Sequence, residues 1–251
     1  MIFNVLPAEQ WPLIVAALML LGAALYSAVG HGGASAYLAI MALAGFAPEE
    51  MRPIALVLNL IVSSIGLWRY RSIGAFDLRL FGLFAVSSIP MAYIGGLAHL
   101  PPETYEKLLG GVLLASATLF FLRPTVAMGA VKPPNITAAL HMGAALGLLA
   151  GLTGTGGGIF LSPLILLMRW AEPRTTAGIA AAFIFVNSAA GLAGNVQQVG
   201  HLSAHMPLYA AGVLIGGLAG SYLGAIRLPR TALIRLLGVV LTLAGVKLLV
   251  G

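Results

Sequence analysis

At two places this chain reads Gly30-His31-Gly32-Gly33-Ala34 and Gly154-Thr155-Gly156-Gly157-Gly158, and these stretches decide its fold. We call them the first and the second break. Each separates two apolar runs in a region long enough to cross a membrane. In lipid every backbone N–H and C=O needs a partner, so helix-breaking backbone survives only where it faces protein or a water-filled cavity. Paired breaks at corresponding places in two halves of a chain are the best sequence indication of a transporter's binding site.

The composition is that of a membrane protein. Of the 251 residues, 60% are hydrophobic and only 8% are charged, whereas soluble domains carry about 25% charged residues. The formal charge is +6, but the basic residues lie in short loops between apolar runs, which is typical of membrane topology and not of nucleic-acid binding. The sequence has no cysteine, and all its acidic residues lie near the ends of apolar runs. Neither a metal site nor a carboxylate-lined cation path is therefore predicted.

The apolar runs fall into two groups of five, joined by a connector at 123–135 that carries Lys132, Pro133 and Pro134. They lie at about 11–29, 34–45, 53–68, 78–98 and 104–122, and then at about 136–152, 158–168, 175–197, 206–226 and 231–250. The second run of each group is too short for a hydrocarbon core of about 30 Å. We predict an all-α polytopic membrane protein with two repeats, 1–122 and 136–251, each containing one short, broken or re-entrant helix.

The two groups resemble each other in sequence. Leu100-Pro101 matches Leu228-Pro229, and Asn59 matches Asn187, both at an offset of 128 residues, while the breaks match at 124. An odd number of elements per repeat inverts the second repeat relative to the first. Alternating the loops then places ten basic residues on one side and only Arg52, Lys107 and Lys247 on the other. The ten are Arg69, Arg71, Arg79, Arg123, Lys132, Arg169, Arg174, Arg227, Arg230 and Arg235.

This asymmetry predicts the orientation. Basic residues concentrate on the cytoplasmic side, so we expect a protein of the cytoplasmic (plasma, or cell inner) membrane with both termini outside and the connector in the cytoplasm. Arg52 follows Glu49 and Glu50 in an expected loop and is interpreted as a partner in a surface ion pair.

The breaks themselves are the first candidates for chemistry. Glycine lacks a Cβ atom, so a ligand can approach the main chain closely. The N-terminus of the short helix that follows each break exposes unpaired N–H groups and the positive end of the helix dipole, which together form an anion site. The alternative is tight packing between helices. The second break lacks the lysine of a nucleotide-binding P-loop, so nucleotide binding is not predicted.

Three polar side chains inside apolar regions complete the candidate site. His31 could donate to an anion or carry a coupled proton, or it could be a neutral histidine bonded to a carbonyl freed by the break. Asn59 and Asn187 could bind a substrate oxygen or bridge two helices, because a buried amide must be paired. The predicted substrate-binding residues are His31, Gly32, Gly33, Ala34, Asn59, Thr155, Gly156, Gly157, Gly158 and Asn187.

The segment 151–164 resembles the hallmark of the sulfite exporter TauE/SafE family of membrane permeases, a G-x-G-G-G cluster followed by apolar residues and proline. The first break is a degenerate version, in which Ala34 replaces a third glycine. The resemblance implies transport of sulfite, an organosulfonate or a similar small sulfur-containing anion.

Three classes of function remain in competition. The first is a secondary transporter for a small oxyanion, with alternating access around a midplane site between the repeats. The second is an anion channel on the same scaffold. The third, a membrane-embedded enzyme, would need a nucleophile paired with a base. The sequence contains neither G-x-S-x-G nor H-E-x-x-H, so we predict no enzyme and no cofactor. The expected partners are the anion, the bilayer and a coupling proton.

Overall fold

The computed structural model describes residues 10–28, 32–122, 130–199, 202–223 and 230–250, and within them all regular secondary structure is helical. The first half contains α1 (Trp11–Ala28), α2 (Ala34–Ala44), α3 (Pro48–Ser72), α4 (Leu78–Leu97) and α5 (Pro102–Leu122). The second half contains α6 (Ile136–Thr153), α7 (Gly158–Met168), α8 (Pro173–Gly194), α9 (Val196–Val199), α10 (Met206–Leu223) and α11 (Arg230–Val250). Within these ranges α3, α4, α6 and α8 are long and apolar enough to cross a membrane. The predicted all-α polytopic fold is confirmed.

One boundary differs from the prediction in a way that matters for the site. Residues 48–52, expected to be a loop, form the first turn of α3. Pro48 begins the helix, where its missing N–H costs nothing, and Glu49 and Glu50 lie in the first turn, where the helix dipole favours negative charge. Hydropathy alone missed this turn because it is polar.

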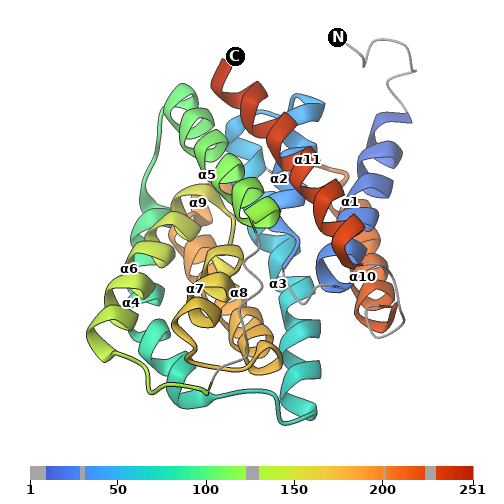
Figure 1. The fold of residues 1–251 in the computed structure, drawn as a ribbon. Coiled ribbons are helices and arrows are strands. Elements are labelled where there is room, and N and C mark those ends of the chain that lie inside the picture. The colour runs from blue at the N-terminus through green and yellow to red at the C-terminus, as the bar shows by residue number, and fades with distance from the viewer. Residues whose placement is uncertain (1–9, 29–31, 123–129, 200–201, 224–229, 251) are drawn as a thin grey trace.

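The helices are arranged in matching pairs across the two halves. α3 and α8 lie together, with α4 and α6 on one flank and α1 and α10 on the other (Figure 1). Glycines at four-residue spacing bring the flanking pairs into backbone contact, because the missing side chain lets two helices approach closely. The paired positions are 143 with 84, 147 with 88 and 151 with 92 between α6 and α4, and 212 with 16, 216 with 20 and 220 with 24 between α10 and α1. In both pairs the residue numbers of the contacts increase together along the two helices, so the paired helices are parallel.

Helices that occupy the same place in each half run antiparallel. Along α3 and α8, Gly191 packs near Leu56 and Gly66 near Ala181. Along α5 and α11, Gly110 and Gly245 each face the other's carbonyl, and Phe121 packs on Gly238. Antiparallel contact between equivalent helices is the arrangement that two inverted repeats would produce, so it supports that prediction.

Both short helices return to the side from which their hairpin started. Just after α7, the Arg169 carbonyl accepts a 2.7 Å hydrogen bond from the Lys132 amide, which precedes α6. Just after α2, the ring of Phe46 packs on Tyr209 in the first turn of α10, and α10 runs parallel to α1. The α1–α2 and α6–α7 units are therefore re-entrant hairpins with a break at each tip.

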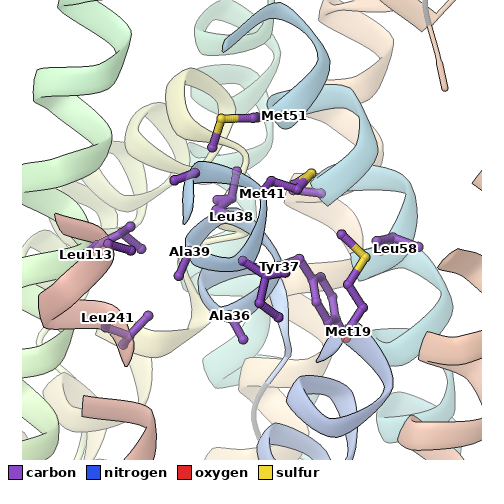
Figure 2. Close-up of a cluster of buried hydrophobic side chains, with 14 of the residues drawn as sticks. Met19, Ala36, Tyr37, Leu38, Ala39, Met41, Met51, Leu58, Leu113 and Leu241 are labelled. Carbon is purple, nitrogen blue, oxygen red and sulfur yellow. The ribbon is translucent and has the colours of Figure 1, made fainter. Parts of the chain in front are cut away.

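Protein surrounds α2 on every side. All its residues from Ala34 to Ala42 are buried, and an 11-residue helix rises only about 16 Å, too little to cross the bilayer. Figure 2 shows the helix among side chains of four neighbours: Met19 of α1, Met51 and Leu58 of α3, Leu113 of α5 and Leu241 of α11. α7 is less completely buried than α2, because Leu167 and Met168 at its C-terminal end are exposed.

Candidate functional site

Both breaks contact one side chain, Ile184 of α8. A Cβ atom on Gly32 would lie 2.9 Å from Ile184 Cδ1, and a Cβ atom on Gly156 would lie 3.0 Å from Ile184 Cγ2. Gly158, the first residue of α7, packs on the same isoleucine. The N-terminal ends of both short helices therefore approach one point inside the bundle.

Asn59 of α3 contacts both breaks at this point. Its side chain is fully buried, at 0% exposure. The position of a Cβ on Gly32 is 3.4 Å from Oδ1, and that of a Cβ on Gly156 is 2.7 Å from Nδ2. Nδ2 donates a 3.3 Å hydrogen bond to Ser188 Oγ, whereas Oδ1 has no partner among the described residues. A buried amide atom without a partner is uncommon and indicates a place for water or ligand.

Asn187 is placed differently from its expected repeat mate. Its Nδ2 donates a 2.7 Å hydrogen bond to Phe183 O, one turn back in the same helix. Its Oδ1 is buried and without a described partner. Counted from the prolines that begin α3 and α8, Asn59 follows by 11 residues and Asn187 by 14. The match at offset 128 in the sequence therefore does not hold in the register of the two helices.

The starts of α2 and α7 are not capped by side chains. Gly33 and Gly157 are the N-cap residues, and neither position has a side-chain cap hydrogen bond. The Gly33 carbonyl accepts from the amides of Ala36 and Tyr37, three and four residues on. The Gly157 carbonyl is bonded in the same way to the third and fourth amides after it. The first two amides of each helix have no intrahelical acceptor, and they carry the positive end of its dipole.

Among the described residues of the two breaks, only those of the second require glycine for their backbone conformation. Gly154, Gly156 and Gly157 have φ values of 82°, 71° and 71°, a left-handed conformation that other residues adopt at a cost of about 1–2 kcal/mol. Gly33 has φ −88°, which any residue can adopt. Ala34 is the first residue of α2 and is fully helical, so the alanine of the degenerate first break is accommodated without backbone strain.

Thr155 lies inside the second break and is 5% exposed. The hydroxyl of Thr153 donates to the Leu149 carbonyl at 2.7 Å. The 2.9 Å contact between the two threonine hydroxyls is then a donation from Thr155 to Thr153. These bonds fix the turn between α6 and α7. His31, the remaining predicted site residue, lies outside the described residues together with Gly30, so its role stays a prediction.

Two contacts of the site had no place in the sequence-based prediction. Ile184 is apolar, and nothing in its residue type distinguishes it from lipid-facing isoleucines. Ser188 carried a signal, because 184, 187, 188 and 191 share one face of a helix. A buried face of α8 could have been inferred from that spacing.

Arg52 corrects an expectation. It does not form a surface ion pair: its side chain is 4% exposed. The guanidinium donates to the carbonyls of Ala98 at 3.0 Å, Gly96 at 3.3 Å and Gly95 at 3.4 Å, and to Asn195 Oδ1 at 2.8 Å. The reason is that residue 52 belongs to a helix, which turns the side chain toward the C-terminal end of α4, where the dipole favours a cation.

Comparison with known proteins places the chain among membrane transporters. The family model described as "Sulfite exporter TauE/SafE" matches residues 14–248. The "Probable membrane transporter protein y4hK" of Sinorhizobium fredii (strain NBRC 101917 / NGR234) is 38% identical over 229 residues, which cover 89% of this chain and 92% of that protein. No solved structure matches.

Proposed function

We propose, from the premise that this chain belongs to the sulfite exporter TauE/SafE family, that it is a secondary transporter for a small oxyanion. The membership makes it an integral membrane transport protein. The proposal adds the cargo, sulfite or an organosulfonate, and the location, the cytoplasmic membrane with both termini outside. The observation that carries it is the meeting of two uncapped helix N-termini at Asn59.

The groups that meet at Asn59 are suited to binding an anion. The free amides at the start of α2 and α7 would bind two oxygens of the anion from opposite sides, with no buried cation required. Asn59 would add its amide as a polar partner, and Asn187 and Thr155 would support the surrounding helices. Ile184 contacts both breaks at this point, so binding requires its side chain to move.

Movement of α8 against the hairpin tips would displace the Ile184 side chain. The same movement would open the site to one side of the membrane at a time. Two inverted halves that exchange roles around a central site produce alternating access. His31, next to Gly32, is the residue that we propose as carrier of a coupling proton.

The test is counterflow in proteoliposomes. Vesicles loaded with unlabelled sulfite under anaerobic buffer are diluted into trace radiolabelled sulfite, with protein-free vesicles as the control. A carrier accumulates label transiently above its equilibrium level, and a channel does not. Failure of sulfite, thiosulfate, taurine and sulfoacetate alike to enter would contradict the proposed cargo, and uptake without overshoot would contradict the carrier mechanism.

A further inference from the structure

Arg52 stands out electrostatically. In the part of the chain that the structure describes, it is the one charged side chain that is buried. Its four oxygen partners are all neutral, three main-chain carbonyls and one side-chain amide. Burial of a charge without a counter-charge is costly, so the position of Arg52 calls for a functional or structural reason.

Asn195, the C-cap residue of α8, adds a second donor beside this charge. It is 2% exposed, and its Oδ1 accepts from Arg52 Nη2 at 2.8 Å. That bond fixes which way the amide points, because a guanidinium can only donate. The opposite end, Nδ2, is buried and has no hydrogen-bond partner among the described residues. An unsatisfied donor next to an uncompensated cation is complementary to an anion.

Arg52 directly adjoins the second break. Gly154 has φ +82°, and a Cβ atom there would lie 3.1 Å from Arg52 O and 3.3 Å from Arg52 Cγ. Tyr105 donates to the Thr153 carbonyl at 3.1 Å just before this turn. The main chain and the Cγ atom of Arg52 are therefore in contact with the turn that leads to the start of α7.

We propose that Arg52 and Asn195 form an oxyanion subsite on the side of the bundle where α3 begins and α4 ends, at one mouth of the transport path. When α4 and α8 separate there, the guanidinium exchanges its carbonyl partners for two oxygens of the anion, a geometry that arginine favours. Asn195 Nδ2 donates to a third. This inference rests on the proposed transport function and assigns its path one entry residue.

The competing interpretation is that Arg52 only ties α3, α4 and α8 together. The substitution Asn195→Asp separates the two. A carboxylate keeps and strengthens the bond to Arg52, but it neutralises the charge and removes the free donor. Asn135→Asp is the matched control: it introduces the same charge at the exposed N-cap of α6, where Asn135 accepts from the Ala138 amide and Asp caps equally well.

The experiment measures sulfite in two ways on the full-length protein: binding to the purified protein, and uptake kinetics in proteoliposomes. We expect Asn195→Asp to melt no lower than wild type, to weaken binding and raise KM about 10- to 100-fold, and to leave the maximal rate within about twofold. Asn135→Asp should match wild type. Arg52→Lys, which keeps the charge but loses the planar fork, should raise KM by a smaller factor.

A folded Asn195→Asp protein with unchanged affinity and KM would overturn the inference and leave Arg52 as a clamp. If that variant does not fold, an unchanged KM in Arg52→Lys overturns it instead. If wild type binds sulfite without transporting it, the proposed function fails. The subsite is then tested by binding alone: weaker binding by Asn195→Asp supports it, and unchanged binding overturns it. Absence of binding by wild type overturns the subsite.

Discussion

Substitution of Gly156 by alanine tests the site at its centre. Gly156 has φ +71°, and so does Gly74 in the turn between α3 and α4, where a Cβ atom would meet nothing within 4 Å. Both alanine variants therefore carry the same left-handed strain of about 1–2 kcal/mol. At Gly156 the added methyl would also lie 2.7 Å from Asn59 Nδ2. The amide must move and lose its bond to Ser188, which costs a further amount of about 0.5–1.5 kcal/mol.

Gly74→Ala is thus a control for backbone strain alone. We expect both variants to unfold at lower temperature than wild type, with Gly156→Ala the lower of the two. Sulfite uptake per folded molecule should be normal in Gly74→Ala. It should fall at least about tenfold in Gly156→Ala, because the methyl occupies the space between the two breaks; a tenfold loss corresponds to only about 1.4 kcal/mol.

The measurement combines a thermal unfolding curve with initial uptake rates, normalised to the protein that elutes as a single species in detergent. Equal uptake by the two variants would refute the assignment of the breaks as the binding site, whatever their stability. A large loss in Gly74→Ala would refute the reasoning in another way, because strain alone would then account for the effect.

Two further predictions concern the neighbours of the breaks. Asn59→Ala should raise KM for sulfite more than Asn187→Ala, because Asn59 contacts both breaks while Asn187 is bonded to its own helix. Competition assays on both variants measure this difference, and the reverse order would contradict the placement of the site. Ile184→Val should lower stability by about 0.5–1.5 kcal/mol and improve competition by taurine relative to sulfite, since it enlarges the space between the breaks; unchanged selectivity would argue against a substrate beside Ile184.

The helices were largely predictable because hydropathy and helix-breaking glycines are local signals. The run expected at 158–168 is α7 to the residue. The failure at 48–52 has the same origin: a polar first turn produces no apolar periodicity, although Pro48 followed by two glutamates is a recognisable helix start. The re-entrant course of the short helices was left open by the sequence, because length alone does not distinguish a hairpin from a tilted span.

The candidate site was predictable only in part. Glycines and buried amides are conspicuous in an apolar sequence, so Gly156 and Asn59 were found. Ile184 was missed because tertiary packing alone brings it into contact with both breaks. Arg52 was misjudged because its sequence neighbours Glu49 and Glu50 suggested an ion pair, whereas tertiary packing places its guanidinium against the end of α4 and Asn195. Its true partners are 43 to 143 residues away.

The three basic residues that the charge asymmetry assigned to the minority side share a feature that bears on orientation. Arg52 bonds to carbonyls at the end of α4, Lys247 Nζ donates to the Ala42 carbonyl at the end of α2 at 2.7 Å, and Lys107 pairs with Glu103 at 2.6 Å. The first two satisfy C-terminal carbonyls, where the helix dipole favours a cation, and the third is matched by its own acid. The orientation rule concerns positive charge in the loops beside the membrane. All three lie within helices, and so do six residues of the majority side: Arg69, Arg71, Arg79, Arg174, Arg230 and Arg235. Applied to both sides, the criterion leaves Lys132 and Arg169 as the basic residues in the described loops, and the bond between their main chains places the two at the same end of the bundle. The expectation of a cytoplasmic connector therefore rests on these two loops, and it stays a prediction.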